Sequence, residues 1–80
     1  MDADTLKAEV RELILEIAEL ATLEDDKALR ELGVDSMVAL EIITAIERKY
    51  GVKVEESELT QIKTLSTITR LLQGKLAARG

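Results

Sequence analysis

The sequence predicts an all-α fold, a four-helix bundle built from three main helices and one short helix within a single domain, 1–80. Three observations favour it. Segments 4–21, 36–50 and 65–77 each repeat apolar side chains at the spacing of one helix face. The chain has no proline to interrupt them. The one alternating stretch, Val52-Lys53-Val54, has no second strand with which to pair, so we expect an extended linker there.

The first predicted helix, 4–21, is the most regular. Asp2 or Asp4 is placed to cap its start, and charged residues occupy its outer face. Its apolar stripe consists of Leu6, Val10, Leu13, Ile14, Ile17 and Leu20.

Residues 22–35 show no sustained periodicity and are expected to form a long loop. Leu29 and Leu32 stand three apart, which allows one helical turn, and Gly33 is placed to take a positive φ. The cluster Glu24-Asp25-Asp26 lacks the spacing of a calcium-binding loop and is interpreted as solvated, with weak, adventitious binding of a divalent ion as the alternative. The residues expected to plug this loop onto the core are Leu23, Leu29, Leu32 and Val34.

The second predicted helix runs over 36–50 and ends at Gly51. A helical wheel turns Ala39, Ile42, Ile43, Ile46 and Tyr50 inward. It turns Glu41, Thr44, Glu47 and Arg48 outward, with the apolar Met37 and Leu40 beside them. These two side chains either form a docking patch or cover the preceding loop.

In the last part of the chain, the sequence pattern predicts a short helix over 56–61 and a final helix over 65–77. Thr64 is placed to cap the final helix, and Gly74 and the small, basic tail are expected to fray. The inward face of this helix is formed by Leu65, Ile68, Leu71, Leu72 and Leu76.

Ser36 stands at the first turn of the second helix, directly after Asp35. Backbone N–H groups have no partner within the helix there, and the helix dipole favours an anion, so a phosphate on this hydroxyl would be well placed. Catalysis by Ser36 is disfavoured because the chain has no His, and Val34 and Val38 stand where a nucleophile elbow needs glycines. The chain also has no Cys. We therefore predict a modified serine rather than an enzyme or a metal site.

The motif Leu32-Gly33-Val34-Asp35-Ser36-Met37 resembles the attachment motif of acyl carrier proteins, and the helix pattern is similar over nearly the whole chain. The resemblance implies that a phosphopantetheinyl transferase links 4'-phosphopantetheine from coenzyme A to Ser36. Asp35 is implied in the magnesium-assisted transfer. The terminal thiol of the arm would then carry an acyl group as a thioester.

The resemblance also implies that acyl-loading, condensing and acyl-transfer enzymes dock on the second helix. The predicted docking residues are Met37, Leu40, Glu41, Thr44 and Glu47. The net charge of −5 is concentrated in the first half of the chain, which argues against nucleic acid and for basic protein patches, or simply for solubility. We find no signal peptide or membrane-spanning run, and expect a freestanding cytoplasmic monomer.

The chain departs from carriers that serve fatty-acid synthesis. It has Val38, Arg48 and Lys49 where such members often carry acids, and Glu55 where a proline often precedes the short helix. These differences favour a carrier for a polyketide or another specialised acyl pathway, although surface drift explains them equally well. Two alternatives remain: a carrier of aminoacyl, peptidyl or D-alanyl groups, and a helical adaptor that lacks the arm.

Overall fold

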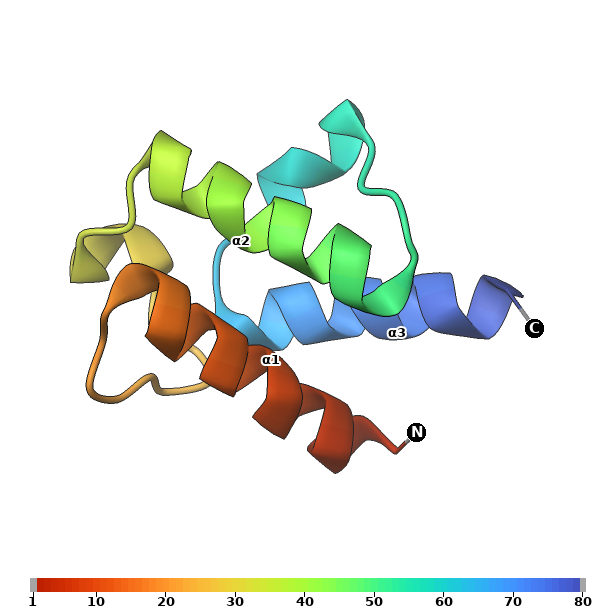
Figure 1. Cartoon of the computed structure of the whole chain (residues 1–80), viewed down its shortest axis with the longest axis horizontal. Coiled ribbons are helices and arrows are strands. Elements are labelled where there is room, and N and C mark those ends of the chain that lie inside the picture. Colours follow the sequence, from red (N-terminus) through yellow and green to blue (C-terminus); the bar gives the residue numbers. More distant parts are fainter. Residues whose placement is uncertain (1, 80) are drawn as a thin grey trace.

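The computed structural model describes residues 2–79, and these residues form helices and connecting loops without a strand. The order is α1 (Ala3–Ala18), the 3₁₀ turn η1 (Leu29–Leu32), α2 (Ser36–Tyr50), the 3₁₀ helix η2 (Glu56–Gln61) and α3 (Leu65–Arg79). α1 packs against both α2 and α3, and η2 packs against α3. Figure 1 shows both ends of the chain on the side opposite the start of α2. The predicted all-α bundle is therefore confirmed.

The bounds of α2 are those predicted, whereas α1 and α3 differ by two or three residues. α1 ends at Ala18 rather than Ala21 because Glu19 adopts a left-handed conformation, with φ 56°. Its N–H donates to the Leu15 carbonyl, which closes the helix without a glycine. α3 continues to Arg79 rather than ending at residue 77, so the helix extends into the tail that we expected to fray.

The long loop after α1 is held to that helix by Asp25. Its carboxylate pairs with Lys7 at 3.1 Å and also accepts from the guanidinium of Arg11, whose Nε donates to the Leu23 carbonyl at 3.1 Å. The interpretation of the acidic cluster as wholly solvated is therefore wrong for Asp25. The hydrogen bond from Lys7 is the main reason that the pKa of this carboxyl lies below its usual value.

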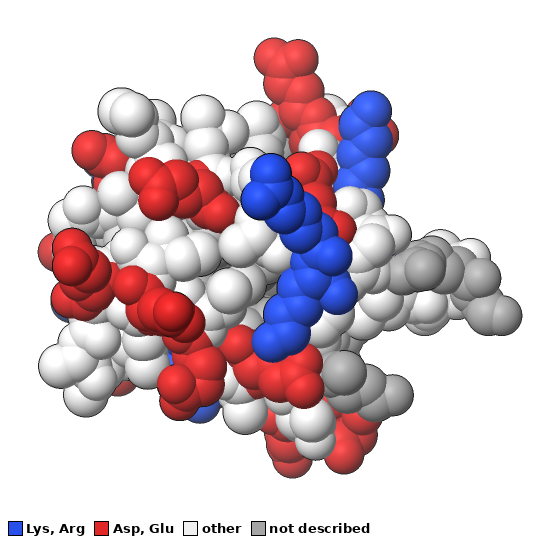
Figure 2. Space-filling model, viewed as in Figure 1, with Lys and Arg blue, Asp and Glu red and all other residues white. Residues whose placement is uncertain are grey.

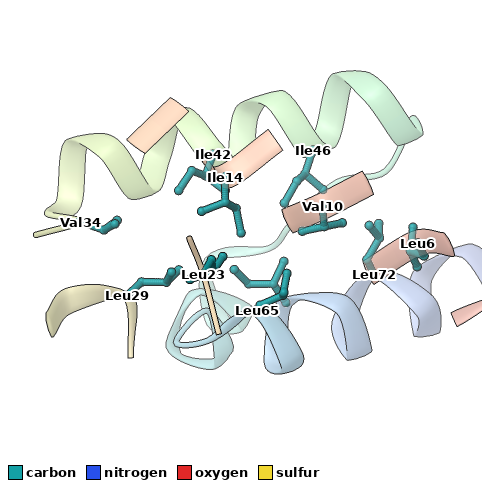
Figure 3. Packing of buried hydrophobic residues seen from close by; sticks show 11 residues of the cluster. Leu6, Val10, Ile14, Leu23, Leu29, Val34, Ile42, Ile46, Leu65 and Leu72 are labelled. Atoms are coloured by element: carbon teal, nitrogen blue, oxygen red, sulfur yellow. The ribbon is translucent and has the colours of Figure 1, made fainter. Parts of the chain in front are cut away.

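The core is aliphatic and is shared by all the main elements. Figure 3 shows its side chains converging from α1, α2, α3 and the long loop into the space between the helices. Leu23, Leu29 and Val34 are buried, which confirms that the loop is plugged onto the core, and Leu32 packs against the same cluster. The remaining members of the cluster are Leu6, Val10, Ile14, Ile42, Ile46, Leu65, Ile68 and Leu72.

The C-terminal end of α2 and the N-terminal end of α3 are capped by the residues that the sequence predicts. Gly51 takes a left-handed conformation with φ 65°, and its N–H donates to the Glu47 carbonyl at 2.9 Å. Tyr50 is half-buried and its hydroxyl donates to Glu9 Oε1 of α1 at 2.8 Å. Thr64 Oγ1 accepts from the Thr67 N–H at 3.1 Å and so caps α3.

Among the described residues, no helix combines the length and apolar character needed to cross a membrane.

Candidate functional site

Ser36 is the first residue of α2 and its side chain is exposed. The chain reaches it through Gly33, which takes φ 87° after η1 as predicted. The next residue, Val34, is buried, and its N–H donates back to the Leu29 carbonyl at 3.2 Å. A left-handed turn and a buried anchor therefore fix the backbone immediately before the serine.

Asp35 is the N-cap of α2. Its Oδ1 accepts from the Val38 N–H at 2.9 Å, and its carbonyl accepts from the Ala39 N–H at 2.9 Å. The first bond satisfies one of the four N–H groups at the start of the helix that have no helical acceptor, and the second is the first hydrogen bond of the helix itself. The N–H groups of Ser36 and Met37 have no preceding helical carbonyl to reach, so they remain available beside the serine hydroxyl.

We expect Asp35→Ala to lower the free energy of unfolding by about 1 kcal/mol because the Val38 N–H loses its acceptor. Asp35→Asn is the matched control, since an amide oxygen caps nearly as well. Urea unfolding followed by circular dichroism measures both. Equal stabilities for the wild type and Asp35→Ala would show that the cap contributes nothing.

An apolar groove opens directly beside Ser36. It has a volume of about 300 Å³, and α2 supplies one wall through Ala39, Leu40 and Ile43 while Leu59 and Ile62 supply the other. A second hollow of about 260 Å³ shares Ala39 and Ile62 with it. This second hollow is lined by Leu29, Val34 and Ile42 on its apolar side and also by Arg30 and Lys63, so two hollows lie next to each other along this side of α2.

The wall formed by η2 is lightly held. None of its residues is buried, and Glu58 supplies its main side-chain ties. Glu58 Oε1 accepts from the Glu55 N–H at 2.8 Å, which winds the first turn, and from Lys75 Nζ of α3 at 2.6 Å. The same carboxylate oxygen of Glu58 therefore both stabilises the first turn of η2 and holds η2 against α3.

The hydrogen bonds from Lys75 and from the Glu55 N–H lower the pKa of Glu58 in the folded chain. Because the folded pKa is depressed, the stabilisation is present above the ordinary glutamate pKa and is lost as the pH falls through the folded value. We expect Glu58→Gln to be less stable than the wild type at pH 7, and we expect this difference to shrink as the pH is lowered through the acid range. Urea unfolding at pH 7 and at a series of acidic pH values tests this. A stability difference that does not shrink as the pH falls would contradict it.

The structure places most of the predicted docking residues on one exposed face of α2. Met37 is 74% exposed and Leu40 is 55% exposed, and Glu41 and Thr44 are also exposed. Glu47 differs from the prediction of an outward-facing carboxylate. It is half-buried, and its Oε2 accepts from the Val54 N–H at 2.8 Å, so it fastens the linker after α2.

Charge is unevenly distributed over the face that contains α2. Figure 2 shows acidic side chains over the second half of α1 and the first half of α2, while basic side chains gather over the far end of α2. The basic residues in the last turn of α2 are Arg48 and Lys49. Lys49 lies 3.9 Å from Glu9 and 5.7 Å from the centre of the Tyr50 ring.

Sequence reasoning did not assign Leu59 and Ile62 to the site. They stand three apart at the end of the short helix, an available signal because residues at this spacing share a face in a 3₁₀ helix. Leu59 is 37% exposed and was not accounted for by the predicted core.

Comparison with known proteins is consistent with this geometry. The family model described as "Phosphopantetheine attachment site" matches residues 8–72. The chain is 40% identical to polyketide-8 synthase acyl carrier protein 2 of Streptomyces avermitilis, over 88% of this chain and 84% of that protein. It is 35% identical to the anthracycline acyl carrier protein DauA of a Streptomyces species, over 95% and 96% of the two chains.

The fold is also similar to a solved structure. The crystal structure of an acyl carrier protein from Thermotoga maritima superposes with a TM-score of 0.84 at 22% identity, covering 100% of this chain and 96% of that one. At that identity the likeness concerns the fold, while the family model and the Streptomyces relatives establish the family. The chain therefore belongs to the phosphopantetheine attachment site family and is an acyl carrier protein, a carrier rather than an enzyme.

Proposed function

We propose that Ser36 is the residue that bears 4'-phosphopantetheine, and that the arm tethers acyl intermediates as thioesters. The observation that carries this proposal is the exposed hydroxyl at the first position of α2, at the mouth of an apolar groove. The arm supplies the thiol that this chain, which has no Cys, does not contain. When the arm is transferred from coenzyme A, the Ser36 oxygen forms the new bond to phosphorus, the pyrophosphate bond of coenzyme A breaks and its nucleotide half leaves. The hydroxyl proton of Ser36 passes to the transferase or to water.

Each neighbour of Ser36 has a role in this proposal. The N–H groups of Ser36 and Met37 face an attached phosphate with the positive end of the helix dipole. The Asp35 carboxylate is bound to the Val38 N–H through Oδ1. We assign its second oxygen as a ligand of the magnesium ion during arm transfer, since Mg²⁺ prefers oxygen ligands such as carboxylates.

The groove beside Ser36 supports a role in sheltering the acyl chain. Its lining is aliphatic apart from Ser36 itself, and a second hollow lined in part by Leu29 and Ile42 lies next to it. Burying apolar surface of the cargo there stabilises it by about 25 cal/mol per Å². A sheltered thioester would hydrolyse more slowly on the folded chain than on the unfolded chain, and equal rates would argue against shelter.

We infer that the cargo belongs to polyketide or related specialised synthesis. Two observations support this. The two Streptomyces relatives are named as polyketide and anthracycline acyl carrier proteins. In addition, the last turn of α2 carries the cations Arg48 and Lys49, where carriers that serve fatty-acid synthesis often have acids. Residues 1–80 would act as one monomeric carrier domain in the cytoplasm. Its partners would be a phosphopantetheinyl transferase and acyl-loading, condensing and acyl-transfer enzymes that dock on α2.

The test is the intact mass of the chain after incubation with coenzyme A and a broad-specificity phosphopantetheinyl transferase. We expect a gain of one phosphopantetheine, located on the peptide that contains Ser36. Absence of any gain in a chain shown by circular dichroism to be helical would overturn the proposal and favour an adaptor without an arm.

A further inference from the structure

The second hollow, next to the groove beside Ser36, combines an apolar floor with two cations. Its volume is about 260 Å³, and the buried residues Leu29, Val34 and Ile42 form the floor. Arg30 and Lys63 also line it, and both of these residues are exposed. A purely hydrocarbon ligand would use only the floor, whereas the cations favour a ligand that has an anionic group as well.

Backbone hydrogen bonds hold the two cations at this hollow although they come from distant parts of the chain. Arg30 directly follows Leu29, whose N–H donates to the Lys63 carbonyl at 3.0 Å. The Lys63 N–H in turn donates to Thr67 Oγ1 of α3 at 3.2 Å. The backbones of Arg30 and Lys63 are therefore fixed side by side at the edge of the hollow.

No anion of the chain neutralises this pair of cations. Within residues 2–79, neither the Arg30 guanidinium nor the Lys63 ammonium takes part in an ion pair. The acid next to Arg30 in sequence, Glu31, pairs instead with Lys27 at 3.5 Å. Two like charges at one hollow repel each other, and an anion bound between them would replace this repulsion by attraction.

We propose that Arg30 and Lys63 bind a carboxylate at the far end of the acyl cargo, while the methylene groups of that cargo lie on the apolar floor. The inference rests on the proposed function, because the arm on Ser36 delivers the cargo. Access is provided by the groove beside Ser36, which shares Ala39 and Ile62 with the hollow. A guanidinium is suited to this role, since it donates two parallel hydrogen bonds to one carboxylate.

The experiment uses two cargoes of equal chain length that differ in the terminal carboxylate. The transferase loads either the adipoyl or the hexanoyl form of the arm onto Ser36 from the corresponding acyl coenzyme A. The variants are Arg30→Gln, Lys63→Gln and the double variant. Arg70→Gln is the matched control, because it removes an exposed cation of α3 that does not line this hollow. Circular dichroism checks that every variant is helical, and thioester hydrolysis is measured for each pair.

We expect the double variant to hydrolyse the adipoyl thioester about three-fold faster than the wild type at low salt, since contacts between exposed charges are modest. High salt should reduce this difference because it screens the charges. The hexanoyl thioester and the Arg70→Gln control should stay within about 1.5-fold of the wild type. Loss of both cations without effect on the adipoyl thioester, or with the same effect on both thioesters, would overturn the inference.

Two further measurements separate the inference from the proposed function. Intact mass before the assay shows whether the acylated arm is present, so a failure of attachment is recognised at that stage. Nuclear magnetic resonance titration of the arm-free chain with adipoyl-pantetheine and hexanoyl-pantetheine then tests the hollow without attachment. Larger shifts for Arg30 and Lys63 with the adipoyl compound, lost in the double variant, support the inference. Equal shifts with the two compounds refute it.

Discussion

Replacing Ser36 with alanine is expected to abolish phosphopantetheine attachment. The chain contains three serines, but Ser57 lies in η2 and Ser66 in the first turn of α3, where the Ser66 N–H is already bound to the Asp25 carbonyl at 3.0 Å. Only Ser36 combines the first position of α2, the Asp35 cap and the apolar groove. Intact mass after incubation with coenzyme A and the transferase should therefore show no gain for Ser36→Ala.

Ser57→Ala and Ser66→Ala are the matched controls, and each should gain one arm as the wild type does. Among the described residues, the Ser36 hydroxyl makes no hydrogen bond that holds the helix, so Ser36→Ala should keep its helical circular dichroism signal. A folded Ser36→Ala that still gains an arm would move the attachment point elsewhere in the chain.

The second large effect is expected from Ile42→Ala, in the middle of α2. Ile42 is 1% exposed and belongs to the cluster that contains Ile14 of α1 (Figure 3). Removing most of a buried isoleucine costs about 2–5 kcal/mol, through lost burial and the cavity that remains. A domain of this size has only about 4–12 kcal/mol of net stability, so this variant should be close to unfolding at room temperature.

Ile42→Val provides a graded control, because deleting one methylene should cost only about 1 kcal/mol. Urea unfolding of the wild type and both variants measures the series. If Ile42→Ala loses no more stability than Ile42→Val, this part of the core is able to collapse around the missing atoms and the packing is looser than the structure indicates.

Local signals in the sequence were sufficient for most of the fold. The ends of α2 follow from Asp35 and Gly51, whose preferences as a cap and as a left-handed residue operate within a few residues of the chain. The position of Ser36 follows in the same way, because the turn at Gly33 and the cap at Asp35 lie directly before it. Short-range signals of this kind are why the place of this serine at the start of α2 could be predicted.

The features that could not be predicted are one unusual backbone conformation and two sets of contacts that form only in the folded chain. Glu19 ends α1 in a conformation that glutamate seldom takes, so no composition signal marks it. Glu47 looks like a surface acid on a helical wheel, and only the path of the linker brings the Val54 N–H to it. Asp25 likewise requires the loop to fold back on Lys7 and Arg11 before its role can be seen. For Glu47 and Asp25, tertiary structure decided how a polar side chain was used.

Two backbone hydrogen bonds join the long loop to the beginning of α3. The Leu29 N–H donates to the Lys63 carbonyl at 3.0 Å, and the Ser66 N–H donates to the Asp25 carbonyl at 3.0 Å. A peptide that stopped at Gly51 would contain the whole attachment motif and yet lack both of these partners, together with Ile62 of the groove. The residues just upstream of Ser36 thus take their shape from a segment that follows them by about thirty positions. The backbone that leads to this serine therefore depends on the folded chain as a whole and not on the attachment motif alone.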